Sequence, residues 1–205
     1  METPNRDQLR VRYGDEQVLV VPAGVLQHLP TGVSTLDDPA AMLPATSSRP
    51  RWQVEHDPAW RQLVCYIVLR QQRKLFLTER LRAQGEARLH SLFSVGVGGH
   101  INLEDGAEPL QSGWRRELAE ELDLDWSPAE ALPRAIINDL SNEVSRDHVG
   151  ILYLVDVPPG RRVAIRETDK MCGQFVAMDR INADFYSRLE SWSQLVVDFL
   201  QKAQD

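Results

Sequence analysis

One predicted helix, residues 109–122, constrains the fold more than any other part of the chain. Its large apolar residues recur at every fourth position and form one stripe: Leu110, Trp114, Leu118 and Leu122. Glu117, Glu120 and Glu121 are spaced i, i+3 and i+4, so their carboxylates share an arc of about 100° beside that stripe. Like charges this close repel one another, and burial increases the cost. A hard divalent cation would relieve the repulsion, because magnesium and calcium prefer oxygen ligands.

Runs of β-branched and aromatic residues predict strands on both sides of this helix. The expected strands are residues 62–69, 75–78, 93–97, 134–137, 149–155 and 173–178, of which the first two form a hairpin. Residues 190–202 close the chain as an amphipathic helix. Strands before and after a central helix, with a terminal helix, predict an α/β (α+β) fold whose helices pack on both faces of a mixed sheet.

The first 56 residues differ in pattern from the rest. Residues 18–22 are a short apolar run that predicts a strand, whereas residues 30–51 are rich in Pro, Thr, Ser, Asp and Gly and predict a loop. We therefore expect an N-terminal extension, residues 1–56, packed on a main domain, residues 57–205. Its role in specificity, dimerisation or stability stays open.

Composition excludes some classes of partner. The 205 residues carry 23 basic and 30 acidic side chains, a net charge of −7, which argues against nucleic acid as the main partner. The sequence has neither a membrane-spanning apolar run nor the apolar stretch of a signal peptide, so we expect no membrane association and a cytoplasmic location. Cys65 and Cys172 lie among apolar neighbours and are expected to be buried, reduced thiols.

Gly98 and Gly99 follow a predicted strand directly, where glycine allows the main chain to approach a metal or a phosphate. From Gly99 onward the sequence resembles the Nudix box: Gly, five residues, Glu, seven residues, then Arg-Glu-apolar-x-Glu-Glu-x-Gly-apolar. The matching residues are Glu108, Arg116, Glu117, Leu118, Glu120, Glu121 and Leu124. Two features depart from the pattern. Eight residues separate Gly99 from Glu108, and Asp123 replaces the final glycine, although Asp tolerates a left-handed backbone.

The resemblance implies a Nudix-like α/β/α sandwich with a mixed sheet. It also implies one to three Mg²⁺ or Mn²⁺ ions and water attack on a phosphorus of a nucleoside diphosphate linked to another moiety. By the same resemblance, Glu117, Glu120, Glu121 and the Gly99 carbonyl would hold metal, and Arg116 would orient a glutamate. Family members are often homodimers. The alternative is a non-catalytic Nudix-fold module that binds or senses nucleotides, which the intact box glutamates disfavour.

The general base and the substrate contacts are not determined by the box. Glu167 and Glu143 follow the helix in predicted loops and are the candidate bases, although either could be plain surface charge. Arg80, Arg82 and Arg88 flank the glycine strand and could reach substrate phosphates or belong to a solvated loop. His100 could contact phosphate or simply pack. Glu104 and Asp105 are expected to be solvated, although either could add a metal contact. The identity of the substrate and its leaving group stays open.

Overall fold

The computed structural model describes residues 4–35, 45–80, 92–128 and 130–203. Within these residues, nine strands form one sheet, with the main order β11-β5-β4-β9-β8-β2. β4 and β9 are parallel, whereas the hairpin β4–β5 and the pair β8–β9 are antiparallel, so the sheet is mixed. The strands are β1 Gln17–Pro22, β2 Gly32–Thr35, β3 Ser47–Pro50, β4 Trp60–Gln71, β5 Lys74–Arg80, β6 Phe93–Ser94, β8 Pro133–Asn138, β9 His148–Asp156 and β11 Met171–Ala177.

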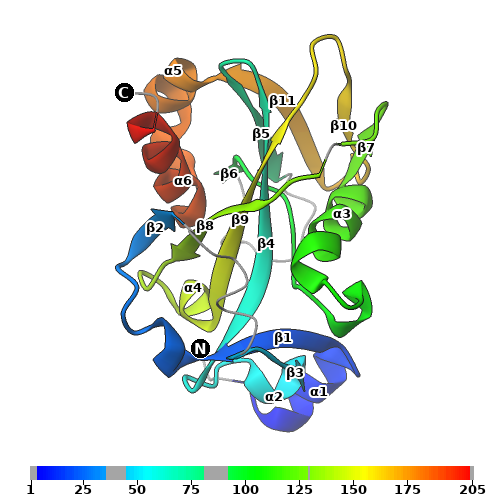
Figure 1. Cartoon of the computed structure of the whole chain (residues 1–205), viewed down its shortest axis with the longest axis vertical. Helices are drawn as coiled ribbons and strands as arrows, with labels where there is room; N and C mark the ends of the chain where they lie inside the picture. Colours follow the sequence, from blue (N-terminus) through cyan, green and yellow to red (C-terminus); the bar gives the residue numbers. More distant parts are fainter. Residues whose placement is uncertain (1–3, 36–44, 81–91, 129, 204–205) are drawn as a thin grey trace.

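Helices cover both faces of this sheet, which confirms the predicted fold class. α3 lies on one side of β4 and β9, and α6 lies on the other (Figure 1). A separate two-stranded sheet joins β7, Leu122–Leu124, to β10, Val163–Ile165. The helices are α1 Arg6–Tyr13, α2 Arg51–Val54, α3 Pro109–Glu121, α4 Glu143–Asp147, α5 Met178–Arg180 and α6 Ser191–Lys202.

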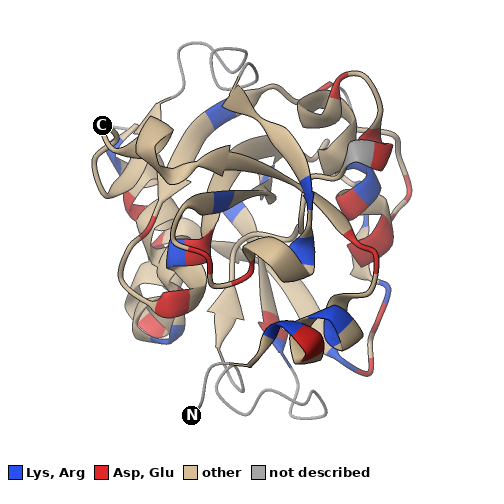
Figure 2. Ribbon diagram, turned by 90° about the horizontal axis from the view of Figure 1, so that it is seen from below, with Lys and Arg blue, Asp and Glu red and all other residues tan. Residues whose placement is uncertain are grey.

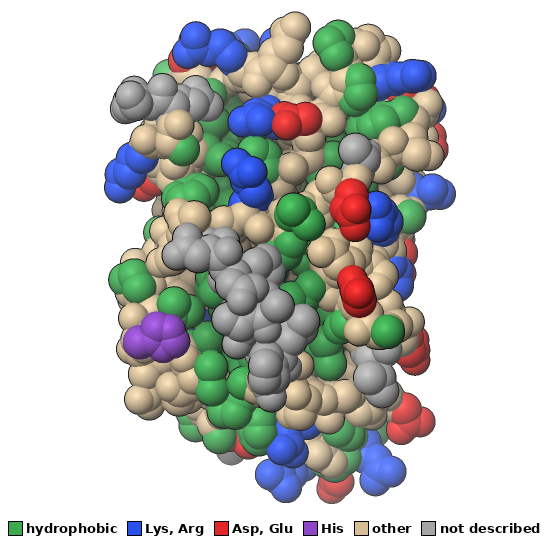
Figure 3. All heavy atoms as spheres, in the orientation of Figure 1, with side chains coloured by type: hydrophobic (Ala, Val, Ile, Leu, Met, Phe, Trp, Pro, Cys, Tyr) green, Lys and Arg blue, Asp and Glu red, His purple; other side chains and the backbone are tan. Residues whose placement is uncertain are grey.

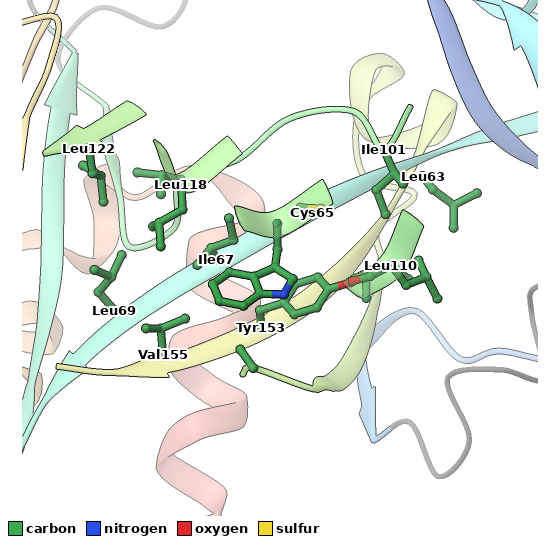
Figure 4. Packing of buried hydrophobic residues seen from close by; sticks show 14 of the residues in the cluster. Leu63, Cys65, Ile67, Leu69, Ile101, Leu110, Leu118, Leu122, Tyr153 and Val155 are labelled. Atoms are coloured by element: carbon green, nitrogen blue, oxygen red, sulfur yellow. The ribbon is translucent and has the colours of Figure 1, made fainter. Parts of the chain in front are cut away.

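β4 is central because its side chains are apolar on both faces. Leu63, Cys65 and Ile67 belong to the core under α3, while Tyr66 and Val68 belong to the core under α6. This alternation follows from the two-residue period of a strand. A strand buried on both faces needs an almost continuous apolar sequence, which is what made β4 recognisable. Figure 4 shows the α3 side of this packing.

The apolar stripe of α3 fixes the orientation of its acidic edge. Pro109 occupies the first turn of the helix, where proline is well tolerated. Trp114 is completely buried and stacks on Tyr153 with ring centroids 6.1 Å apart, and the Tyr153 hydroxyl donates to the Leu110 carbonyl at 2.5 Å. Each large apolar side chain buried here contributes roughly 1.5–3 kcal/mol. The packing therefore holds Glu117, Glu120 and Glu121 at the rim of the buried face.

The N-terminal segment contributes strands to the main sheet. β1 pairs with both β3 and β4, and β2 pairs with β8 at the sheet edge. The loop predicted for residues 30–51 is therefore wrong at β2 and β3. Both strands are short, and their stability comes from partners distant in the sequence, which a local pattern does not reveal. The division at residue 56 stays a prediction, and strands from both sides of it share one sheet.

Three further expectations need correction. The strand expected over residues 93–97 is limited to Phe93–Ser94, followed by an isolated bridge between Val97 and Ile67. Cys65 is buried as expected, but Cys172 is exposed, because it lies on β11 at the end of the sheet order. Asp123 lies within β7 and has no positive φ, so the glycine of the box pattern is not needed for a left-handed turn here.

Charges of both signs are dispersed over the surface. Seen from the side of α1 and α2, segments with acidic and with basic residues both occur around the molecule (Figure 2). On the face in Figure 3, they are interspersed with hydrophobic side chains. Within the described residues, no helix is long and apolar enough to cross a membrane.

Candidate metal and phosphate site

A pocket of about 490 Å³ opens beside the acidic edge of α3. It combines the glycine turn, the loop that precedes α3, the acidic edge of α3 and one residue of the N-terminal segment. Its lining residues are Glu16, Gly98, Gly99, His100, Asn102, Glu104, Arg116, Glu117, Glu120 and Glu121. Five of these ten are glutamates and one is an arginine, so the pocket is strongly acidic.

Both glycines of the turn have close neighbours. Gly98 has a φ of +145°, and a Cβ there would lie 2.0 Å from the main-chain oxygen of Cys65. A Cβ on Gly99 would lie 2.6 Å from Oε2 of Glu117. The Gly99 main chain therefore lies directly against the Glu117 carboxylate. Its carbonyl accepts a hydrogen bond from Cys65 N at 2.8 Å, which holds the turn on β4.

Arg116 organises the acidic groups around it. Nη1 donates to Glu117 Oε1 at 2.7 Å and to Glu120 Oε1 at 3.3 Å. Nε and Nη2 donate to the two carboxylate oxygens of Asp105, at 2.7 and 3.2 Å, and Nη2 also donates to the His100 carbonyl at 2.8 Å. A guanidinium has five N–H donors, and these five contacts use all of them. Arg116 thus contacts the carboxylates of Asp105, Glu117 and Glu120.

Asp105 corrects an expectation about the longer loop. It was expected to be solvated, but its side chain is 2% exposed and pairs with Arg116 through both oxygens. Asp105 also accepts from the main-chain nitrogen of Asn102 at 2.8 Å, which closes the short helix η4, Leu103–Asp105. Gly113 lets this loop approach α3, because a Cβ there would lie 2.8 Å from Asp105 Oδ2. Glu104 is exposed, as expected.

The environment of the pocket disfavours charge on two of the glutamates. Burial raises the pKa of Glu117; Arg116 opposes that rise, and the neighbouring Glu120 and Glu121 add to it. Burial also raises the pKa of Glu121, which Arg80 opposes and Glu167 increases. Glu120 differs, since its side chain is 60% exposed, although it also accepts from Arg116 at 3.3 Å. Bringing these carboxylates together therefore costs free energy that a cation would offset.

Glu167 lies close to the end of α3 although it is distant in sequence. The pairing of β7 with β10 places Ile165 opposite Leu122, and Arg166 N donates to the Glu121 carbonyl at 3.0 Å. Glu167 is exposed and forms an ion pair with Lys170. Glu143, the other candidate base, begins α4 and is not among the residues that line the pocket.

Among the three arginines expected to reach phosphate, only Arg80 lies within the described residues; Arg82 and Arg88 lie outside them. Arg80 is at the end of β5, forms an ion pair with Glu190 at 3.5 Å and acts on the pKa of Glu121. It is thus positioned at the edge of the acidic cluster, outside the lining of the pocket.

His100 belongs to a chain of hydrogen bonds. Its Nε2 lies 3.1 Å from Nε2 of His148, and Nδ1 of His148 lies 2.7 Å from the Val144 carbonyl. A carbonyl only accepts, so Nδ1 of His148 carries the proton, and Nε2 of neutral His148 accepts from Nε2–H of His100. Burial lowers the pKa of both histidines, which favours these neutral forms. Nδ1 of His100 is then an acceptor, not a donor to phosphate.

The donors at the pocket fit a hard divalent cation. Gly99 and the three glutamates offer only oxygen atoms, the ligand type that Mg²⁺ and Mn²⁺ prefer. Within the described residues, the carboxylates of these three glutamates are not gathered closely around one point. The group whose ligand atoms do lie within 4.8 Å of one another is Glu55, His56 and Asp147.

Sequence reasoning missed Glu16 and Asn102 as lining residues of the pocket. Glu16 lies in the connection between α1 and β1, about a hundred residues from the box, and no motif identifies it. Asn102 lies in the longer loop, and its Oδ1 is buried without a hydrogen-bond partner. Contacts between segments distant in the sequence bring Glu16 to the pocket: β1 pairs with β4, and Leu19 N donates to the Ile101 carbonyl at 2.8 Å. No local signal could have revealed them.

Comparison with known proteins identifies relatives and the fold. No protein-family model matches the chain. Protein YmaB of Bacillus subtilis (strain 168) is 38% identical over 157 residues, which cover 74% of this chain and 76% of YmaB. The crystal structure of Tm1382, a proposed Nudix hydrolase, superposes with a TM-score of 0.78 at 26% identity and covers 92% of this chain and 100% of Tm1382. A MutT Nudix hydrolase from Burkholderia pseudomallei gives a TM-score of 0.49 at 18% identity, over 66% of this chain and 95% of its own.

The relation to YmaB extends over most of both proteins, and the likeness to Tm1382 extends over nearly the whole chain. The likeness to Tm1382 supports a hydrolase of the Nudix family. The chain therefore belongs to the family of protein YmaB and has the Nudix hydrolase fold.

Proposed function

We propose that this protein is a metal-dependent Nudix pyrophosphohydrolase. Its substrate would be a nucleoside diphosphate linked to another moiety, and water would cleave the phosphoanhydride bond. The observation that carries the proposal is the contact between the buried Glu117 carboxylate and the Gly99 main chain, beside Glu120 and Glu121. The acidic helix edge and the glycine turn thus converge on one point of the pocket.

The hydrogen bonds of Arg116 explain why a cation is required. All its donors are used within the protein, so it offers none to a substrate phosphate. The remaining charged residues that line the pocket are glutamates, which would repel a diphosphate. Glu117, Glu120, Glu121 and the Gly99 carbonyl would hold Mg²⁺ or Mn²⁺, which neutralises phosphate oxygens and lowers the pKa of an attacking water when bound.

The protein's own groups supply the remaining steps. We assign the general base to Glu167, which lies next to Glu121 across the β7–β10 pair. Its carboxylate accepts a proton from water as the new oxygen–phosphorus bond forms, and the bridging anhydride oxygen leaves with the bonding electrons. Arg80, at the edge of the cluster, can stabilise charge on the leaving phosphate. A small nucleotide derivative is the partner that a pocket of this size accommodates.

The test is a hydrolysis panel with Mg²⁺ in ¹⁸O-labelled water, analysed by mass spectrometry. The panel contains ADP-ribose, NADH, nucleotide sugars, coenzyme A, dinucleoside polyphosphates and nucleoside triphosphates. We expect hydrolysis of at least one compound that stops when EDTA is added, and the label identifies the phosphorus attacked. If no compound is hydrolysed and a nucleotide binds tightly in calorimetry, the protein is a binding module and the proposal is wrong.

A matched pair of variants tests the base. Glu167→Gln should lower kcat by about a hundredfold, within the range that a general base contributes. Glu143→Gln is the control and should keep full activity, since Glu143 begins α4 and, unlike Glu167, is not among the groups that act on the pKa of Glu121. The reverse result would assign the base to Glu143.

A further inference from the structure

We propose that Glu16, from the N-terminal segment, selects the substrate by accepting hydrogen bonds, together with His100, from hydroxyl or amino groups of the moiety attached to the diphosphate. This inference rests on the proposed function, because it assumes that a nucleoside diphosphate derivative occupies the pocket. Glu16 lines the same pocket as the box glutamates but lies outside the box.

Glu16 is held in place by its own main chain and by Arg51. Arg51 N donates to the Glu16 carbonyl at 2.9 Å, and Arg51 Nη1 contacts both Glu16 carboxylate oxygens, at 3.2 and 3.4 Å. Arg51 is itself fixed by Glu55 at 3.3 Å and by the Tyr13 ring, 4.1 Å from its guanidinium carbon. The carboxylate therefore points to the pocket in a defined orientation, with a side chain that is 32% exposed.

The two groups present acceptors to the same part of the pocket. Oε1 of Glu16 lies 3.9 Å from Nδ1 of His100. Because Nε2–H of His100 donates to His148, Nδ1 carries a lone pair. An ionised carboxylate is also an acceptor only. A substrate group placed here must therefore donate, as sugar hydroxyls and amino groups do.

A phosphate at this position would be unfavourable. It offers acceptors to acceptors, and its negative charge would lie beside Glu16, whose partner Arg51 is already shared with Glu55. The pocket should therefore favour a diphosphate whose second moiety is a sugar over one that continues as a further phosphate. Specificity of this kind comes from rejection as much as from attraction.

The experiment is equilibrium binding of ADP-ribose and of ATP by calorimetry. Ca²⁺ replaces Mg²⁺, so that binding is measured with slow turnover. For the wild type we expect tighter binding of ADP-ribose than of ATP. Glu16→Gln should reduce the ratio of the two affinities at least about tenfold, since the amide removes the charge and adds donors. Asp15→Asn is the matched control, because Asp15 is exposed and does not line the pocket.

A role for Glu16 in stability alone would change both affinities equally, or neither. Either result would overturn the inference, as would preferred binding of ATP by the wild type. Thermal unfolding of each variant confirms that the fold is kept, and Glu16→Lys provides a second variant whose affinity for ATP should rise. Failure of the proposed function is distinguishable, because it would appear as absence of hydrolysis with Mg²⁺ and not as an unchanged affinity ratio.

Discussion

Replacing Arg116 by methionine should destabilise the protein because it leaves buried carboxylates without their partner. The side chains of Asp105 and Glu117, which Arg116 contacts at 2.7 Å, are 2% and 9% exposed. Removing one partner of a buried ion pair costs about 3–5 kcal/mol. Arg116 itself is 30% exposed, so we expect about 3 kcal/mol. For a chain of this size that lowers the unfolding temperature by about 6–12 °C.

The assay is urea and thermal unfolding at pH 7 in EDTA, with Arg115→Met as the control. Arg115 lies on the same helix and contacts only the Trp114 ring among the interactions described, at 4.8 Å, so its loss should cost below about 1 kcal/mol. The loss in Arg116→Met should shrink as the pH falls and the carboxylates take up protons. A loss below 1 kcal/mol, or one independent of pH, would refute the reasoning.

Two further predictions concern the same pocket. Gly99→Ala places a Cβ 2.6 Å from Glu117 Oε2; the displaced carboxylate should weaken Mg²⁺ or Mn²⁺ binding by about 10- to 100-fold in calorimetry, and unchanged affinity would contradict the assignment. The pKa of Glu117 is raised by burial, so its charge destabilises the metal-free fold as the pH rises above the ordinary glutamate value of 4.5. In EDTA, Glu117→Gln should therefore unfold at a higher temperature than the wild type at pH 7 but not at pH 4, and equal differences at both pH values would show that burial of the charge is not the cause.

The parts of the fold that the sequence predicts are those with a strong local pattern. β4 is continuously apolar, and α3 repeats its large residues at helical spacing, so both were recognisable without a structure. β2 and β3 have four residues each and half-buried or exposed side chains. They exist because β8 and β1 pair with them, and no local pattern encodes that pairing.

The residues of the site also fall into those that the sequence predicts and those that it does not. Residues of one helix, such as Glu117 and Arg116, are predictable from spacing alone, because the helix fixes their relative directions. The prediction that Asp105 is solvated is wrong. Arg116 binds Asp105 because the longer loop lies close to Gly113, and no local pattern encodes that contact. Glu16 could not be predicted because a strand pairing brings it to the pocket.

The central claim is that the glutamates at the edge of α3 hold the cation that makes hydrolysis possible. The most direct test compares the wild type with Glu121→Gln on the substrate found in the panel, over a range of Mg²⁺ concentrations. We predict a fall in kcat of at least about a hundredfold, as the loss of one charge-stabilising group commonly produces, while in EDTA the variant should be no less stable to thermal unfolding than the wild type, because burial already disfavours the Glu121 charge. Full activity in this variant, at the same Mg²⁺ dependence, would contradict the claim.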